Sequence, residues 1–196
     1  FVRFESDISF TIPGMSDVMP YDSSRFCDLT PEDIDEYEAV FSRVITKAVA
    51  EFKPDIIHSN HLWLVSSITR QLFPEIKMVT TCMGSDLRQF GSCRHLQQRV
   101  LKGCRNIDTV FALSEVQKTE ISKLYGINSD KIEVIGAGYN DELFTKSAKS
   151  DPDPVQIVYA GKLSNAKGVP WMLKALAKID SSNWKLHLLG SGAGIE

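Results

Sequence analysis

The stretch VQIVYAGKLSNAKG, residues 155–168, decides the fold of this chain. Its first six residues, 155–160, are mostly β-branched, aromatic or small, a pattern typical of a strand. A polar loop containing Lys162 and Lys167 follows. Beyond the loop, apolar residues recur at helical spacing, and Pro170 stands near the helix start, where its missing N–H is harmless. The stretch therefore predicts a strand, a cationic loop and a helix.

A loop of this kind is where α/β proteins bind anions, because it lies at the carboxyl end of a strand and faces the N-terminus of a helix. The loop begins at Gly161, and its two lysines, Lys162 and Lys167, can hold two neighbouring phosphates as point charges. The same residues also fit an ordinary βα loop with solvated surface charges. The stretch by itself leaves both interpretations open.

The composition narrows the class of protein. With 196 residues, 43% of them hydrophobic, the chain can form one large or two small domains. A net charge of −3 without a basic tail argues against a nucleic-acid binder. No apolar run reaches the roughly 18 residues of a membrane span, and no signal peptide is evident, so we expect a cytoplasmic protein. The first residue is not Met, so we expect a piece of a longer protein.

The four cysteines lie at positions 27, 82, 93 and 104, and no two have Cys-x-x-Cys spacing. Cys93 and His95, with Cys82 and Cys104, fit no structural zinc pattern. We therefore expect no metal site, and free thiols as in a reducing cytosol.

Charge is spread unevenly along the chain. Residues 1–60 carry twelve acids and five bases, whereas residues 77–105 carry six bases and one acid. The basic stretch can face an anionic ligand or a membrane surface, or it can be a solvated helix face. The sequence does not decide between these interpretations.

Strand and helix patterns alternate through the first two thirds of the chain. We expect a strand or hairpin at 1–12, a loop at 13–29, and a helix from Pro31 to residue 52 with Thr30 as its N-cap. Apolar runs predict strands at 55–58, 77–82, 108–113 and 131–135, separated by helices at 62–73, 93–103 and 115–126. This alternation predicts a parallel sheet with helices on both faces.

A polar, proline-containing segment at residues 146–154 predicts a linker, and a second βαβ unit follows it, with a further strand at 184–189. We therefore predict two Rossmann-like domains. Ligands bind at the carboxyl ends of strands in such folds, so the loops after each strand are the candidate site. His58, at the end of the first of these strands, fits a core histidine better than a ligand.

Five motifs in this order resemble a family 4 retaining glycosyltransferase of the GT-B fold. They are DIIHSNHLW at 55–63, TCMGSDLR at 81–88, FALS at 111–114, VIGAGYN at 134–140, and YAGKL at 159–163 with KG at 167–168. The resemblance covers roughly residues 30–196. It implies an α/β protein of two doubly wound parallel-sheet domains. Residues 1–150 would form the acceptor-side domain, incomplete at its start, and residues 151–196 would begin a truncated donor domain.

The resemblance implies a UDP- or GDP-linked sugar as donor, with its diphosphate held by Gly161, Lys162 and Lys167. Lys162 stands where the family usually has Arg; Lys neutralises phosphate but lacks the bidentate fork. Cations at this position stabilise the charge that grows on the leaving nucleoside diphosphate. No metal or other cofactor is then implied.

On the acceptor side, the resemblance implies Asn60 and His61 as the catalytic residues, because they occupy the place of a family motif that touches the transferred sugar. Met83 stands where close relatives of the second motif have His. The further acceptor or cleft residues implied are Gly84, Ser85, Asp86, Ser114 and Gly138. The family's Gly-rich loop would precede Phe1 and its Glu-x7-Glu region would follow Glu196, so we expect this chain alone to be inactive.

The function implied is transfer of a sugar from a nucleotide sugar to an acceptor, with retention of anomeric configuration. The acceptor can be a small molecule, a lipid-linked molecule or a glycan, and a peripheral contact with a membrane is compatible with it. Two alternatives stay open: a nucleotide-sugar epimerase or phosphorylase on the same fold, and a non-catalytic nucleotide-sugar-binding module.

Overall fold

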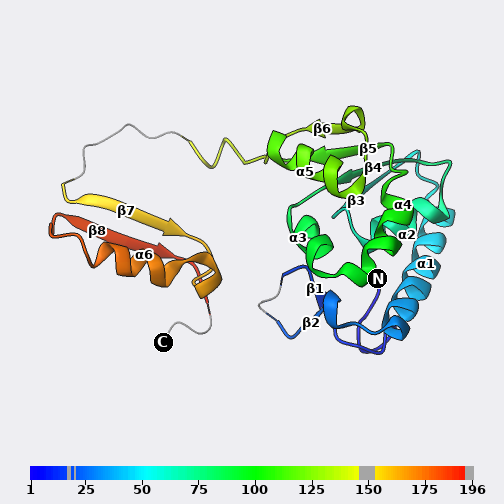
Figure 1. Ribbon diagram of the computed structural model, residues 1–196, viewed down its shortest axis with the longest axis horizontal. Helices are drawn as coiled ribbons and strands as arrows, with labels where there is room; N and C mark the ends of the chain where they lie inside the picture. Colours follow the sequence, from blue (N-terminus) through cyan, green and yellow to red (C-terminus); the bar gives the residue numbers. More distant parts are fainter. Residues whose placement is uncertain (17–18, 20, 146–152, 193–196) are drawn as a thin grey trace. The chain divides into compact units, whose positions relative to one another are not determined.

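A four-stranded parallel sheet, ordered β3-β4-β5-β6, is the centre of the fold (Figure 1). The computed structural model describes residues 1–16, 19, 21–145 and 153–192. The strands are β3 (Ile56–Asn60), β4 (Lys77–Thr81), β5 (Thr109–Ala112) and β6 (Ile132–Val134). All four predicted strands are present with slightly shifted ends. The parallel sheet predicted from the alternation is therefore confirmed.

The connections between these strands are helical. They contain α2 (Leu64–Leu72), α3 (Ser85–Ser92), the short helix η2 (Arg94–Leu96), α4 (Gln97–Cys104) and α5 (Glu115–Tyr125). Because the strand order follows the chain order, right-handed crossovers place these helices on one face of the sheet. The opposite face is only partly covered by the described residues, and Ile56, His58 and Asn60 of β3 are exposed on it.

Helix α3 was not predicted. Its sequence, SDLRQFGS, contains two serines and a glycine, which favour turns over helix interiors. Leu87 and Phe90 are buried and attach the helix to the core. Burial therefore outweighs the weak helix propensity of this segment.

The long helix α1 (Pro31–Phe52) follows the prediction closely. The Thr30 side chain accepts a hydrogen bond from the Asp33 N–H at 3.1 Å, and the Asp33 carboxylate accepts one from the Thr30 N–H at 2.9 Å. This reciprocal capping box satisfies two N–H groups that the helix start would leave unpaired. The helix ends at Lys53, whose left-handed conformation precedes Pro54.

The predicted strand or hairpin at residues 1–12 is wrong. The Asp7 carboxylate accepts a hydrogen bond from the Arg3 N–H at 2.9 Å and folds residues 3–7 into a turn. The only strands before α1 in the described part of the chain are the two-residue β1 (Pro13–Gly14) and β2 (Ser24–Arg25), which pair in parallel. A short helix, η1 (Phe26–Asp28), leads into α1. The alternating apolar residues pack on the core instead of forming a ladder.

The core of this part lies between the sheet and its helices. Gly103 of α4 stands against Ser67 of α2 so closely that a Cβ would overlap the Ser67 carbonyl oxygen. The Ser67 hydroxyl donates to the Arg99 carbonyl oxygen at 2.6 Å and accepts from the Gly103 N–H at 3.0 Å. The absence of a side chain at Gly103 therefore allows α2 and α4 to pack at short range.

The C-terminal part is a separate unit with its own two-stranded parallel sheet. It contains β7 (Val155–Ala160), the short helix η4 (Asn165–Lys167), α6 (Val169–Leu176) and β8 (Trp184–Leu189). The strand, loop and helix predicted from residues 155–168 are confirmed, including Pro170 in the first turn of α6.

The chain divides into two compact units, Phe1–Gly138 and Tyr139–Glu196. The sequence predicted the boundary at the linker 146–154, of which residues 146–152 lie outside the described residues. In the parts of the chain that the structure describes, no helix is long and apolar enough to cross a membrane.

Candidate functional site

The loops that follow the strands of the first unit gather at one edge of the sheet. Because the strands are parallel and in register, Asn60 pairs with Thr81 and Thr81 with Phe111 at their carboxyl ends. The predicted residues at this edge belong to the loops after β3, β4, β5 and β6. The topology therefore brings the first three of these loops side by side.

Asn60 and His61 form the turn at the end of β3. Asn60 is exposed, and His61 has a positive φ of 70°, which is uncommon for a residue other than glycine. The His61 N–H donates to the Thr81 carbonyl oxygen at 3.0 Å, and the Ser66 hydroxyl donates to the His61 carbonyl oxygen at 2.5 Å. His61 Nδ1 is buried and has no hydrogen-bond partner among the described residues. The backbone is held on both sides while one ring nitrogen stays unsatisfied.

His58 is exposed, so the prediction of a core histidine is wrong. Its Nε2 lies 2.8 Å from the Thr81 hydroxyl, and its ring meets Phe111 edge-on, with centroids 6.0 Å apart. The alternation of the strand places this side chain on the less covered face of the sheet.

Asp86 is completely buried at the start of α3. One carboxylate oxygen accepts a hydrogen bond from the Leu62 N–H at 2.7 Å, and both oxygens lie within 3.2 Å of the Met83 N–H. The carboxylate therefore ties the loop after β3 to the loop after β4. Burial, followed by the nearby charge of Asp86, raises the pKa of the Cys82 thiol.

The remaining predicted residues of this unit have simpler surroundings. Gly84 has a φ of 89° and precedes Ser85, the first residue of α3. Ser114 is exposed and caps α5 by accepting from the Gln117 N–H at 3.2 Å. A Cβ on Gly138 would meet no atom within 4 Å, so this residue is not packed against the others.

The loop after β7 in the second unit holds the predicted diphosphate residues. The Gly161 N–H donates to the Leu189 carbonyl oxygen at 2.9 Å, and the Leu163 N–H to the Ser191 carbonyl oxygen at 3.0 Å. The Tyr159 hydroxyl donates to the Lys162 carbonyl oxygen at 2.8 Å. The backbone carrying Lys162 is therefore fixed against the loop after β8.

Lys167 ends η4 and is exposed immediately before α6. Its N–H donates to the Ser164 carbonyl oxygen at 3.2 Å, and Gly168 follows in the left-handed conformation, with a φ of 74°. The structure therefore places Lys162 and Lys167 in one strand-to-helix loop. Cations and a helix N-terminus in the same loop are suited to a phosphate group.

The basic stretch at residues 77–105 is largely engaged within the first unit. Arg99 pairs with Asp35 at 2.7 Å and with Glu38 at 3.0 Å, and Lys77 lies 3.7 Å from Asp108. Arg88 donates to the Met15 carbonyl oxygen and Arg105 to that of Tyr125. These contacts favour a structural role for the stretch over an anion-binding one.

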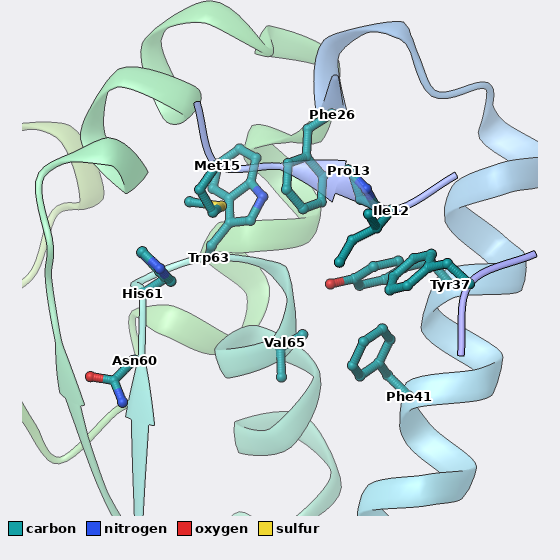
Figure 2. Close-up of a pocket in the computed structure, with 11 residues that line it drawn as sticks. Ile12, Pro13, Met15, Phe26, Tyr37, Phe41, Asn60, His61, Trp63 and Val65 are labelled. Atoms are coloured by element: carbon teal, nitrogen blue, oxygen red, sulfur yellow. The ribbon is translucent and has the colours of Figure 1, made fainter. Parts of the chain in front are cut away.

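Sequence reasoning missed a pocket beside His61. The cavity has a volume of about 190 Å³ and lies between α1, α2, the end of β3 and the N-terminal segment (Figure 2). It is lined by Phe4, Ile12, Pro13, Met15, Phe26, Tyr37, Phe41, Asn60, His61, Trp63 and Val65. Five of these are aromatic, but they are too far apart in sequence to form a motif.

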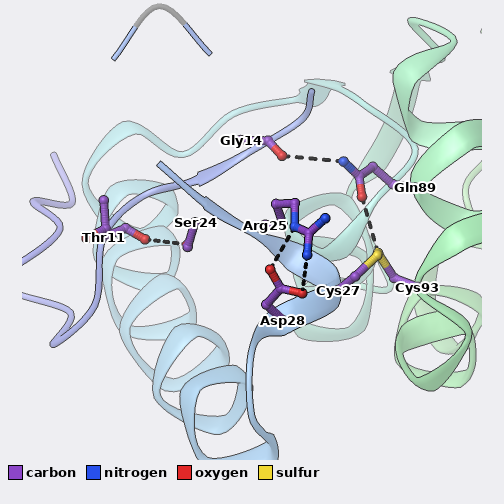
Figure 3. A network of polar contacts seen from close by, with 8 residues as sticks. All are labelled: Thr11, Gly14, Ser24, Arg25, Cys27, Asp28, Gln89 and Cys93. Carbon is purple, nitrogen blue, oxygen red and sulfur yellow. Dashed lines mark hydrogen bonds and ion pairs between the residues drawn. A yellow bond between two sulfur atoms is a disulfide. The ribbon is translucent and has the colours of Figure 1, made fainter. Parts of the chain in front are cut away.

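The N-terminal segment that forms one wall of this pocket is attached to α3 and the residue after it (Figure 3). A disulfide joins Cys27 to Cys93, and the Gln89 side-chain amide donates to the Gly14 carbonyl oxygen at 3.4 Å. Free thiols were expected, and for these two cysteines that expectation is wrong because the fold brings them together. Cys82 and Cys104 are free and buried.

Comparisons with known proteins match this chain to glycosyltransferases. Residues 30–143 match the family model described as Glycosyltransferase Family 4. The chain is 24% identical over 160 residues to an uncharacterized glycosyltransferase of Methanocaldococcus jannaschii, covering 71% of this chain and 41% of the relative. It is 25% identical over 154 residues to the glycogen synthase of Mycobacterium tuberculosis, covering 74% of this chain and 37% of the relative.

Solved structures share the fold. The apo form of the lipopolysaccharide outer core galactosyltransferase WaaB superposes with a TM-score of 0.55 at 17% identity, over 80% of this chain and 42% of that one. A glycosyltransferase from Rickettsia africae gives a TM-score of 0.55 at 20% identity, over 88% of this chain and 46% of that one. The chain spans about 40% of the length of the two curated relatives named above.

Proposed function

This chain belongs to glycosyltransferase family 4 and has the α/β GT-B fold, and from that premise we propose that the whole protein transfers a sugar from a nucleotide sugar to an acceptor with retention of configuration. The acceptor hydroxyl oxygen bonds to the anomeric carbon, whose bond to the diphosphate oxygen breaks. The electron pair of that bond leaves with the nucleoside diphosphate, which takes up the hydroxyl proton.

The loop between β7 and α6 is the observation that carries this proposal. It combines Lys162 and Lys167 with the N-terminus of α6, and its backbone is fixed by hydrogen bonds to the loop after β8. Two cations and a helix N-terminus stabilise the negative charge that develops on a departing diphosphate. In this proposal Gly161, Lys162 and Lys167 bind the donor diphosphate, and the donor is linked to UDP or GDP.

The proposed acceptor side is the edge of the first sheet. In this proposal Asn60 and His61 are the catalytic residues, and Gly84, Ser85 and Ser114 border the acceptor. Asp86 acts by positioning, because its carboxylate is occupied by the Leu62 and Met83 N–H groups. Gly138 also belongs to the proposed cleft. In this proposal residues 1–150 form the acceptor domain and residues 151–196 begin the donor domain.

The proposal includes a cytoplasmic location. The Cys27–Cys93 disulfide is unusual for that compartment, because cytosolic thiols are normally kept reduced. Compartment fractionation of the native host tests this part separately from the activity. Recovery of the protein outside the cytoplasm would overturn the location and leave the transfer reaction untouched.

The diphosphate assignment is tested by calorimetry with UDP and GDP on the whole protein. The double variant K162A/K167A should bind the better of the two at least about tenfold more weakly, a loss of about 1.4 kcal/mol. Lys185→Ala is the matched control, because Lys185 is exposed at the opposite end of the same pair of strands. An unchanged dissociation constant in the double variant would sink the assignment.

Product analysis with a labelled donor separates the proposed reaction from its alternatives. A glycoside supports transfer, whereas an epimerised nucleotide sugar or a sugar phosphate would identify an epimerase or a phosphorylase. Binding of the donor without any turnover, including hydrolysis, would identify a non-catalytic module. The non-catalytic alternative rests on Met83, which is 48% exposed and stands where the resembled family motif usually has His.

A further inference from the structure

The pocket beside His61 has the size and lining of a small-molecule site. Its volume is about 190 Å³, and an apolar cavity of roughly 150 Å³ is known to hold benzene. All of its lining residues except Asn60 and His61 are apolar or aromatic. A one- or two-ring compound therefore matches the space.

The aromatic side chains of the pocket form one continuous group. Tyr37 and Phe41 of α1 lie 4.4 Å apart between ring centroids, and Phe26 meets Trp63 edge-on at 5.7 Å. Figure 2 shows the two α1 rings facing Val65 of α2, with Trp63 and Phe26 beside them. The rings are inclined by 34° in the first pair and by 80° in the second, so the lining offers both faces and edges to a planar ligand, a geometry that favours aromatic partners.

Two buried polar atoms of side chains in this apolar lining lack hydrogen-bond partners among the described residues. His61 Nδ1 and the Trp63 indole N–H are buried without hydrogen bonds among the described residues. A buried polar group left unsatisfied costs about 1–3 kcal/mol, so a ligand oxygen that reaches these atoms recovers part of that cost. A plain hydrocarbon chain would leave them unpaired.

The N-terminal segment contributes one wall of this pocket. Phe4, Ile12, Pro13, Met15 and Phe26 all precede residue 30, where the match to the family model begins. The segment is held in place by the Cys27–Cys93 disulfide and by the hydrogen bond from Arg88 to the Met15 carbonyl oxygen at 3.0 Å. The pocket wall is therefore attached to the rest of the first unit, and the proposed site residues Asn60 and His61 are part of the lining.

We propose that this pocket binds the acceptor, and that the acceptor is a one- or two-ring aromatic compound bearing a hydroxyl group. The inference rests on the proposed function for the role of the bound compound as an acceptor. Its binding chemistry rests on the pocket alone. The aromatic body fills the space between α1, α2 and the N-terminal segment, and the oxygen lies toward His61.

Calorimetry with 2-naphthol on the 196-residue chain tests the binding. We expect a saturable one-to-one complex, and V65F, which fills the cavity, should weaken it at least about tenfold. Val116→Phe is the matched control, since Val116 is also the second residue of its helix but is 77% exposed. If V65F fails to fold, methyl NMR of the unmodified chain replaces it, with naphthol shifting Val65 and Ile12 but not Val116.

The outcomes of these experiments distinguish failure of the pocket assignment from failure of the proposed transfer reaction. Absence of naphthol binding, or equal binding by V65F, would overturn the pocket assignment even if the whole protein turns over its donor. Binding of 1-decanol in preference to 2-naphthol would overturn the aromatic class in favour of an alkyl chain. Naphthol binding by a protein that never turns over a nucleotide sugar would support the pocket and overturn its role in transfer.

Discussion

The Asp86 carboxylate accepts a hydrogen bond from the Leu62 N–H at 2.7 Å, so a residue of α3 holds the loop that follows β3. The same carboxylate accepts from the Met83 N–H, and it is completely buried. Replacing it therefore affects two neighbouring loops at the candidate site. Charge-assisted hydrogen bonds of this kind are the stronger ones in proteins.

Asp86→Ala should lower the free energy of unfolding by about 2–5 kcal/mol, because the buried Leu62 N–H and the partly buried Met83 N–H both lose their acceptor. Asp86→Asn keeps one amide oxygen and should cost less. Urea denaturation measures both, with Asp130→Ala in the exposed helix η3 (Ser129–Lys131) as control. A loss in Asp86→Ala no larger than in the control would contradict this role.

Gly103→Ala should destabilise the chain by about 1–3 kcal/mol, since the new Cβ would overlap the Ser67 carbonyl oxygen and push α2 and α4 apart. Gly91→Ala provides the opposite case: Gly91 lies in α3 with no atom within 4 Å of the position of a Cβ. That change should be neutral or stabilising by up to about 1 kcal/mol. Thermal unfolding compares the two, and equal effects would argue against the close helix packing.

Asp108 should contribute stability that is lost in acid. Burial by itself raises the pKa of its carboxyl, but the hydrogen bond from the Met78 N–H and the charges of Arg70 and Lys77 outweigh it, so the pKa is lowered. A group with a lowered pKa stabilises the fold above its unfolded pKa of about 3.9 and loses this effect as the pH falls through the folded value.

Asp108→Asn should therefore be less stable than the unmodified chain at about pH 7, and the difference should shrink as the pH falls below about 4. Unfolding curves at several pH values measure it, with the exposed Asp55→Asn as control. A difference that stays constant down to about pH 2 would show that the Asp108 charge is not the cause.

Thiol titration should reveal the Cys27–Cys93 disulfide. Of the four cysteines, two are paired and two, Cys82 and Cys104, are buried with their thiol pKa raised by burial. The native chain should react slowly, the denatured chain should show two thiols, and the denatured and reduced chain all four. Four thiols without a reductant would contradict the disulfide.

Losing the disulfide should also lower stability. It closes a loop with a sequence separation of 66, for which chain entropy gives roughly 4 kcal/mol. Cys27→Ser should therefore unfold at a lower urea concentration than the oxidised chain and should match the unmodified chain under reducing conditions. Equal midpoints for the variant and the oxidised chain would show that the disulfide adds no stability.

Much of the fold could be predicted from the sequence because its signals are local. Thr30, Pro31 and Asp33 define the start of α1 within four residues, and Ser114 and Gly126 mark the two ends of α5. The loop carrying Lys162 and Lys167 could be placed between β7 and α6 for the same reason. Strand ends in a parallel sheet share an edge, so the position of the candidate site followed from the topology.

What depends on residues far apart in the chain was decided only by the tertiary structure. Helix α3 forms because Leu87 and Phe90 find a core to enter, although its sequence favours a turn. The buried Asp86 carboxylate accepts a hydrogen bond from the Leu62 N–H, 24 positions earlier in the chain. Cys27 forms a disulfide with Cys93 across 66 positions. The aromatic pocket beside His61 likewise joins Phe4 to Val65, and no local pattern encodes such a meeting. The sequence by itself determined most of the elements and the sheet edge that carries the candidate site, because hydrogen bonding and apolar periodicity act over a few residues. The tertiary structure decided which side chains meet there, because packing acts between segments that only folding brings together.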